Sequence, residues 1–489
     1  MPVYGTHNKK KGRFMIKLFY LLTFILLASL PAEAQYRYQK DFTAEDFLKR
    51  RTAVYEEIGD NLALIQGAEE VQGFIVFRQS NTFYYLSGLE VPTSYLLLDG
   101  KRKTTTLYIT HGEGGSDAVQ LSYEDAELVK KITGVDSVRP LEKMGSDLIY
   151  NLWSSPVAAL YVPYSPDEKH QQSRDEILAG FGRRLVDPFD SRPSKAGHLI
   201  HRIRTSYPQF EIRDLTPILD VLRSIKDEKE INLIRKASQL AGLGIMEAIR
   251  STKPGVKEYQ LEAAASFVFK NNGARGLSYH AIVASGKNTW QGHYSANSDT
   301  TKDGDLVLMD LAPDYHYYTS DVTRMWPING KYTKDQRDLY GFVIEYHKAL
   351  MRHLRPGVSW DQVLDEAAAD MRKVLDKMTF SKEIYRQACE DALKFRGHLQ
   401  HAVGMNVHDI DPEGNIVREG TVFSVDPMIW VRPEKKYIRM EDVVVITKDG
   451  VENLSANLPI EMDDIEALWK QEGIVQKRPP SLDKPYSTK

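Results

Sequence analysis

The sequence predicts two domains, an α/β domain followed by a larger α+β domain. At 489 residues the chain exceeds what one hydrophobic core usually supports. Short apolar strands alternate with helical segments in the first part, which indicates a mixed sheet. In the second part long amphipathic helices accompany strands and a hairpin, which indicates helices on one side of a curved, mostly antiparallel sheet.

The α/β domain is expected over residues 40–215. Its strands are apolar runs bounded by turn residues, and four are predicted, at 73–77, 94–98, 105–109 and 158–162. A glycine-rich stretch at 111–115 follows the third strand. It lacks the spacing of a nucleotide-binding fingerprint, so a plain loop is expected there.

The α+β domain is expected over residues 216–471. Asp227 and Glu230 have the spacing of a capping box, and the apolar residues after them repeat at helical spacing until Pro254 and Gly255. Proline and glycine end a helix readily, so one long helix is expected here. Four further helices are predicted, at 258–271, 334–354, 360–378 and 382–394.

Both ends of the chain are expected to lie outside these domains. Residues 1–34 combine five basic residues, the apolar run 18–30 and a small-residue ending at Ala34, the layout of a secretory signal peptide cleaved after Ala34. A membrane anchor is the alternative, but the run is shorter than the ~20 residues of a span. We therefore expect an exported protein, periplasmic or secreted, without stable membrane association after cleavage. Residues 472–489 are rich in proline and poor in apolar side chains, which predicts a disordered tail.

Composition excludes other classes of protein. The formal net charge is −3, and removal of residues 1–34 takes away five basic and one acidic side chain, which lowers it to −7. Neither value indicates a basic surface for nucleic acid. Cys389 is the only cysteine, so no internal disulfide can form, and its place in a predicted helix indicates a buried thiol. A homo-oligomer such as a dimer is compatible with the sequence.

Asp310 and Asp321 lie on either side of a predicted hairpin turn. If the turn is centred on Tyr315 and His316, the two carboxylates are directly opposed cross-strand neighbours. Like charges placed in that way destabilise a sheet. Their apolar neighbours predict burial, which is costlier still for an unpaired carboxylate. A bound divalent cation would offset both the repulsion between the carboxylates and the cost of burying them.

Three later segments contain further candidate ligands. His401 and His408 lie in the first, Asp426 ends an apolar strand, and Glu441 opens another strand with Arg439 two residues earlier on the same face. Four carboxylates and one imidazole are too hard for a structural zinc site. They suit a pair of ions such as Mn2+, Co2+ or Zn2+ that share a bridging hydroxide. Each residue alone has an ordinary structural explanation, but the ordered set predicts hydrolytic chemistry.

The order of these residues resembles that of the pita-bread metallopeptidases, which include methionine aminopeptidase, prolidase and aminopeptidase P. The phrases at 320–324 and 439–442 carry the resemblance, and the stretches 77–88 and 321–330 are most similar to aminopeptidase P. The resemblance covers roughly residues 45–470. It implies a pita-bread catalytic domain preceded by an N-terminal domain of the creatinase/aminopeptidase P type.

The resemblance also implies the ligands of two divalent ions, with Mn2+ as the first choice and Co2+ or Zn2+ as alternatives. Asp321 and Glu441 would bridge the two ions. His401 and Asp426 would complete the coordination of the first ion, and Asp310 would chelate the second.

Four residues have further implied roles. His293 would contact the scissile-bond carbonyl, and His408 would stabilise the tetrahedral intermediate. Asp426 would also act as the proton shuttle, and Arg439 would hold a bridging carboxylate from the second shell. Such outer partners fix the orientation and basicity of metal ligands.

Two positions differ from the family pattern. The family has Glu where this chain has Asp426, and Asp is one methylene shorter, about 1.5 Å of reach. The family also has a histidine where this chain has Gly397, and His398 follows one residue later. Either His398 takes the place of that histidine or its substrate contact is missing.

Three functions fit the sequence. The first is an exported aminopeptidase that releases the N-terminal residue from peptides with proline second. The second is a prolidase, which cuts only Xaa-Pro dipeptides. The third is a binding or scaffold homologue with weakened catalysis, which Asp426 and Gly397 would explain. The size of the N-terminal domain favours the first, whose partner is a proline-containing peptide. A metal-free creatinase-like hydrolase would not need Asp310, Asp321 and Glu441 together.

Overall fold

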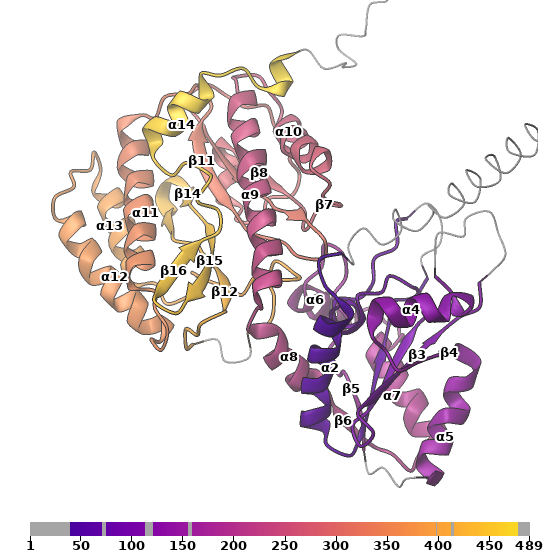
Figure 1. Cartoon of the computed structure of the whole chain (residues 1–489). Helices are drawn as coiled ribbons and strands as arrows, with labels where there is room; N and C mark the ends of the chain where they lie inside the picture. Colours follow the sequence, from indigo (N-terminus) through magenta and orange to yellow (C-terminus); the bar gives the residue numbers. More distant parts are fainter. Residues whose placement is uncertain are drawn as a thin grey trace, which may run out of the picture.

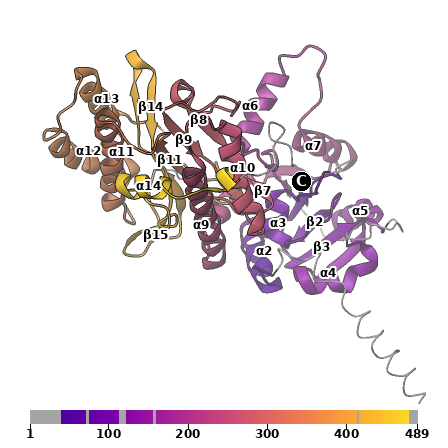
Figure 2. The same cartoon turned by 90° about the horizontal axis from the view of Figure 1, so that it is seen from above.

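A computed structural model describes residues 40–70, 75–112, 121–154, 159–397, 399–411 and 415–477 (Figure 1). The predicted signal peptide at 1–34 and His398 lie outside these residues. Within the described ranges, no helix has the length and apolar character needed to cross a membrane. The chain forms an N-terminal unit and a larger C-terminal unit that lie side by side in both views (Figures 1 and 2).

The N-terminal unit contains a mixed six-stranded sheet of order β4-β3-β2-β1-β5-β6. The central strands β1, β2 and β3 are antiparallel, whereas β4, β5 and β6 join in parallel. Its strands are β1 (Leu62–Gln66), β2 (Tyr95–Asp99), β3 (Thr104–Ile109), β4 (Ser137–Pro140), β5 (Ala159–Val162) and β6 (Glu211–Asp214). Its helices are α2 (Ala44–Ile58), α3 (Asn81–Ser87), α4 (Ala126–Thr133), α5 (Met144–Ser154), α6 (Arg174–Arg184) and α7 (Lys195–Ser206).

Both faces of this sheet are buried. Along β2, Leu96 and Leu98 belong to one hydrophobic core while Leu97 belongs to the core on the other face. Because successive strand residues point to opposite faces, a sheet covered on both sides needs continuous apolar runs. Such runs are the reason that β2, β3 and β5 agree with the predicted strands.

The other strands of the sheet were predicted poorly. No strand forms at the described residues of 73–77, where 75–77 are irregular and 71–74 lie outside the described ranges. Conversely, β1, β4 and β6 were not predicted. The two outermost strands, β4 and β6, carry charged and exposed residues, which hide the apolar pattern.

Helix α8 (Thr216–Ser224) leads into the C-terminal unit, whose long helices agree with prediction within a few residues. Helix α9 begins with the predicted capping box of Asp227 and Glu230. The helices are α9 (Glu228–Ser251), α10 (Glu258–Asn271), α11 (Lys334–His353), α12 (Trp360–Leu375), α13 (Glu383–Lys394) and α14 (Met462–Trp469). Residues Ile474–Lys477 form a 3-10 turn that is hydrogen-bonded to α9, so the predicted disordered tail does not begin at 472.

Two three-stranded sheets form the centre of the C-terminal unit, with orders β11-β9-β8 and β12-β15-β16. An isolated bridge between Thr323 and Glu441 joins them. One hydrophobic core packs α9 to α13 against these strands, as the pita-bread fold requires. The strands are β7 (Gly276–Leu277), β8 (Ile282–Ser285), β9 (Leu306–Asp310), β10 (Pro313–Asp314), β11 (Thr323–Pro327), β12 (Val422–Val425), β13 (Met428–Val431), β14 (Lys436–Arg439), β15 (Asp442–Thr447) and β16 (Gly450–Asn453).

The predicted register of the aspartate hairpin was wrong by two residues. Asp310 pairs with Thr323, so Asp321 lies diagonal to it rather than opposite. The turn is centred on His316 and Tyr317, whose φ angles are 53° and 75°. Two-residue hairpin turns favour positive φ, but neither residue type signals it in a sequence.

Contacts with the N-terminal unit explain this turn. The Tyr317 ring stacks on Tyr84 with 3.6 Å between centroids, and its hydroxyl accepts a hydrogen bond from the backbone N–H of Gln79 at 2.8 Å. Arg78 binds Asp314 at 2.9 Å. The stretch 77–88, which most resembles aminopeptidase P, therefore contacts the hairpin that carries the aspartates.

Candidate metal centre

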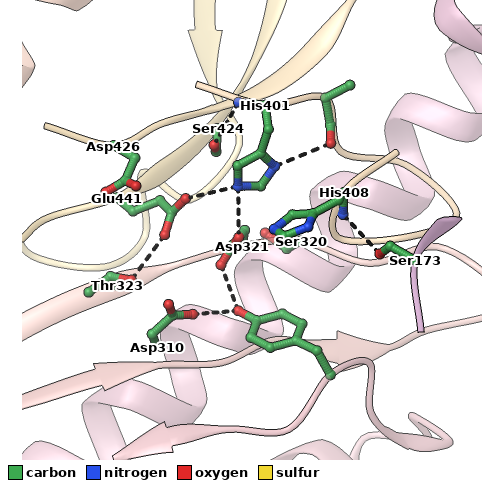
Figure 3. Close-up of polar contacts among 12 residues, drawn as sticks. Ser173, Asp310, Ser320, Asp321, Thr323, His401, His408, Ser424, Asp426 and Glu441 are labelled. Atoms are coloured by element: carbon green, nitrogen blue, oxygen red, sulfur yellow. Dashed lines mark hydrogen bonds and ion pairs between the residues drawn. The ribbon is translucent and has the colours of Figure 1, made fainter. Parts of the chain in front are cut away.

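All five predicted metal ligands meet at the centre of the C-terminal unit (Figure 3). Asp310 ends β9, Asp426 directly follows β12, and Glu441 directly precedes β15. All four carboxylates are at most 5% exposed. The half-buried His401 places its Nε2 3.2 Å from Asp321 Oδ2 and 3.5 Å from Glu441 Oε1. Strand ends thus converge on one buried acidic cluster.

The donor set fits a divalent cation. One ligand atom each from Asp321, His401 and Glu441 lies within 4.8 Å of the others. Two metal–ligand bonds of roughly 2.0–2.2 Å can span the 3.2 and 3.5 Å between His401 Nε2 and the two carboxylate oxygens. Within the described part of the chain, Glu441 Oε1 is buried and accepts no hydrogen bond. A buried carboxylate oxygen that accepts no hydrogen bond is costly, and a cation would be a closer partner for it than His401 Nε2 at 3.5 Å.

In the described part of the chain, Arg439 is the one guanidinium that binds carboxylates of this cluster. It donates from Nε to Asp426 at 2.7 Å, from Nη1 to Asp310 at 2.6 Å and from Nη2 to Glu441 at 2.7 Å. The predicted contact with a bridging carboxylate is therefore present, and two more were not predicted. Burial opposes charge on His401, but Asp321 and Glu441 raise its pKa. Arg439 and His401 together supply two positive charges against four carboxylates, so the cluster suits a bound cation.

Tyr279 was missed by the sequence analysis. Its hydroxyl lies 2.7 Å from Asp310 Oδ1 and 2.6 Å from Asp321 Oδ1. Burial and these carboxylates raise the pKa of Tyr279 well above its usual value, so the hydroxyl stays protonated and donates to either aspartate. Tyr279 lies in a loop just after β7, without a pattern that predicts chemistry.

The acidic cluster holds protons more tightly than isolated carboxylates do. Burial and the charges of Glu441 and Asp310 raise the pKa of Asp321 well above its usual value. Burial also raises the pKa of Asp426, despite Arg439. Burial would raise the pKa of Glu441 too, but Arg439 and His401 lower it to about 2. A cation that binds here would displace protons, so its affinity should fall with falling pH.

His408 also reaches the centre. Its ring meets the His401 ring edge-on, with 4.7 Å between centroids. Its backbone N–H donates to Ser173 Oγ at 3.2 Å (Figure 3), and its Nδ1 lies 3.0 Å from Asp175 Oδ2. Burial and the neighbouring His401 lower the pKa of His408. Both hydrogen-bonding partners belong to the N-terminal unit, which sequence spacing cannot reveal.

The structure does not join His293 to this cluster. Its side chain is exposed, and among the described residues no hydrogen bond or ion pair links it to the carboxylates. Its loop is nevertheless well anchored, because the buried Glu258 accepts five hydrogen bonds from that loop and the strand before it. The donors are Ser285 N, Ser285 Oγ, Asn288 Nδ2, Tyr294 Oη and Asp299 N.

Gly397 has a local structural explanation. A Cβ at this position would lie 2.1 Å from Cζ of Phe395, so a side chain there would displace that ring. The Phe395 ring in turn packs edge-on against Trp430, with 5.2 Å between centroids. This aromatic contact occupies the space that a histidine at 397 would need.

Comparison with known proteins agrees with this arrangement. Residues 232–448 match the family model of Metallopeptidase family M24, and residues 47–156 match that of the aminopeptidase P N-terminal domain. The Xaa-Pro aminopeptidase of Escherichia coli is 28% identical over 463 residues, which cover 88% of this chain and 98% of the relative. Human Xaa-Pro aminopeptidase 3 is 27% identical over 423 residues, which cover 81% and 77% of the two chains.

Solved structures show the same architecture. Aminopeptidase P from E. coli with the inhibitor Pro-Leu superposes with a TM-score of 0.71 at 26% identity, and the match covers 89% of this chain and all of the other. Proline aminopeptidase P II from Yersinia pestis gives a TM-score of 0.70 at 27% identity, with 88% and 99% of the two chains covered. This chain therefore belongs to the pita-bread metallopeptidases of family M24 and is a metallo-aminopeptidase most similar to the aminopeptidase P group.

Proposed function

We propose that the protein is an exported Xaa-Pro aminopeptidase that uses two divalent ions, most readily Mn2+. The observation that carries the proposal is the buried cluster of four carboxylates, which has one guanidinium and a carboxylate oxygen without a hydrogen bond. The family match and the similarity to Xaa-Pro aminopeptidases over most of the chain support the same function.

The ligands divide between two ions as follows. Asp321 and Glu441 would hold both ions, His401 and Asp426 would supply the remaining ligands of one ion, and Asp310 would hold the other. Two ions held here would supply Lewis-acid chemistry, a lowered pKa for the attacking water and polarisation of the scissile carbonyl. Tyr279 and Arg439 orient the carboxylates, since each donates to the oxygens that face the centre.

Three side chains act on protons and on the substrate. Asp426 would accept the proton of the attacking water, since its carboxylate lies within the cluster beside Arg439. His408 would stabilise the tetrahedral intermediate from its position beside His401. His293 contacts the scissile carbonyl once its exposed loop meets the peptide.

Proline specificity follows from the chemistry of the bond. An Xaa-Pro bond is a tertiary amide without an N–H. A site built for it can fill the space around the ring and needs no acceptor for a hydrogen that is absent. The structure of one relative, aminopeptidase P from E. coli, contains the inhibitor Pro-Leu, which supports a proline-directed site in this chain.

The test compares Xaa-Pro-Xaa, Xaa-Pro and Xaa-Ala-Xaa peptides, with Mn2+ and with a chelator. We expect rapid cleavage of Xaa-Pro-Xaa only, and only with metal. Cleavage confined to Xaa-Pro would identify a prolidase. Equal rates on Pro and Ala peptides would identify a broad aminopeptidase, and metal binding without cleavage would favour a scaffold.

Export has its own test. Expression of the full chain in a Gram-negative host should give a mature protein that begins at Gln35, in the periplasm or medium, by N-terminal sequencing. Cytoplasmic protein with an intact N-terminus would contradict export and would leave the peptidase proposal unaffected.

A further inference from the structure

Four charged side chains form a buried cluster where the two units meet, and we call it the linker cluster: Glu168, Arg223, Lys226 and Asp409. Each side chain is at most 3% exposed. Arg223, on α8, donates from Nη1 to both oxygens of Glu168, at 3.1 and 2.8 Å. Its Nη2 donates to Asp409 at 2.7 Å, and Lys226 Nζ lies 3.2 Å from the same carboxylate.

Two members of this cluster belong to the chain segments that hold His408. Asp409 directly follows His408 in the chain. Glu168 begins the segment 168–175, whose Ser173 and Asp175 contact the backbone N–H and the Nδ1 of His408. Arg223 therefore ties together the two pieces of chain that hold His408.

The chemistry of arginine suits this task. Its planar guanidinium donates in fixed directions, so it can hold two carboxylates in one relative orientation, whereas the ammonium of lysine is a flexible point charge. Burial opposes charge on Asp409, but Lys226 and Arg223 overcome it and lower the pKa of Asp409. The link is thus a balanced set of buried charges.

We propose that Arg223 is a positioning residue, which fixes His408 over the metal centre by holding segment 168–175 against Asp409. This deepens the proposed function, on which it rests, because the role of His408 belongs to that reaction. It assigns the N-terminal unit a part in catalysis, since that unit sets the position of a histidine from the other unit.

The first test replaces the guanidinium by an ammonium. Arg223→Lys should lower kcat for Xaa-Pro-Xaa cleavage about tenfold or more, because small displacements of a reacting group are costly. KM should stay within about threefold, since the metal ligands are intact. The matched control is Arg235→Lys, which alters an arginine–carboxylate pair with Glu452 far from His408 and should leave kcat unchanged. Equal losses in both variants, or a lower melting temperature with unchanged kcat, would overturn the proposal.

A double-mutant cycle separates positioning from general stability. Asp175→Asn removes the partially exposed carboxylate at His408 Nδ1. If Asp175 and Arg223 act through the same histidine, the fold loss of kcat in the double variant should be clearly smaller than the product of the fold losses in the two single variants. Losses that multiply would mean that Arg223 acts elsewhere. If Arg223→Lys does not fold, Glu168→Gln replaces it in the cycle, because glutamine keeps an acceptor for Arg223. This variant should also lower kcat.

A readout without turnover keeps this test separate from that of the proposed function. In protein with labelled histidines, the imidazole NMR signal of His408 should shift in Arg223→Lys or Glu168→Gln and stay in place in Arg235→Lys. An unmoved His408 signal would contradict positioning even in an active enzyme. A moved signal in a protein without Xaa-Pro cleavage would refute the reaction and retain the positioning role.

Discussion

The metal centre and the linker cluster are both buried assemblies of charged side chains, yet their carboxylates behave in opposite ways. At the metal centre three of the four carboxylates share Arg439, and the pKa of the fourth, Asp321, rises well above its usual value because of burial, Glu441 and Asp310. In the linker cluster, Arg223 and Lys226 overcome the effect of burial, and the pKa of Asp409 falls. The difference indicates which buried acidic site has too few positive groups of its own among the described residues and is therefore suited to bind cations from solution.

The largest effect is expected from Asp321→Asn. The substitution keeps the shape of the side chain and an acceptor for Tyr279, but it removes one charge from the metal centre. Peptidase activity should fall at least about 100-fold, since substitution of the residues that merely hold metal ligands often lowers metal affinity or activity by 10–100-fold. The melting temperature in chelator should stay the same or rise, because the remaining carboxylates repel one another less. Wild-type metal content and rate would refute the role of Asp321.

In the linker cluster, an Asp→Asn substitution should instead lower the free energy of unfolding. Asp409→Asn leaves Arg223 and Lys226 without their shared charge, and loss of one partner of a buried ion pair costs about 3–5 kcal/mol. Urea unfolding measures it, with Asp321→Asn in chelator as the matched control. Equal free energies of unfolding for these two variants would remove the distinction between the sites.

Asp442 directly follows Glu441 and forms a third buried charged site, whose contribution to stability should depend on pH. The Asp442 carboxylate binds Arg324 at 2.7 Å, and His347 Nε2 lies 3.2 Å from it. Burial lowers the pKa of His347 to about 4. The unfolded chain binds a proton near the ordinary pKa of about 6.5, so stability should be lost as the pH falls from there toward 4, by up to about 3 kcal/mol.

His347→Leu cannot titrate and tests this effect. We expect its free energy of unfolding, measured by urea in chelator from pH 7 to pH 4, to fall less steeply than that of the parent protein. Parallel curves for the two proteins would mean that His347 does not titrate in this range.

The smallest effect is expected from Asp426→Glu. Asp426 is held by Arg439 at 2.7 Å and by its own N–H to the carbonyl of Leu399 at 3.0 Å, so an additional methylene would overfill the centre. Activity should fall about tenfold, equivalent to about 1.4 kcal/mol of barrier. A tenfold gain instead would indicate a decayed site and favour the scaffold function. Gly397→His should not rescue activity, because it displaces Phe395.

The meeting of the five candidate metal ligands in one cluster was predictable because their order and neighbouring phrases form a linear pattern. Contacts between distant segments were not predictable. Tyr279 reaches the aspartates from a short loop, and the linker cluster joins residues from 168 to 409 that share no local signal. The hairpin register failed for a related reason, because stacking of Tyr317 on Tyr84 supports a turn that local preferences do not favour.

Metal content measured together with activity tests the unbalanced charge of the metal centre most directly. The purified mature protein should bind two divalent ions per chain, lose Xaa-Pro-Xaa cleavage in chelator and regain it with Mn2+. The same titration on Asp321→Asn should show loss of at least one ion. A protein that binds no divalent ion, or that cleaves equally well without one, would contradict the assignment of this cluster as a metal centre.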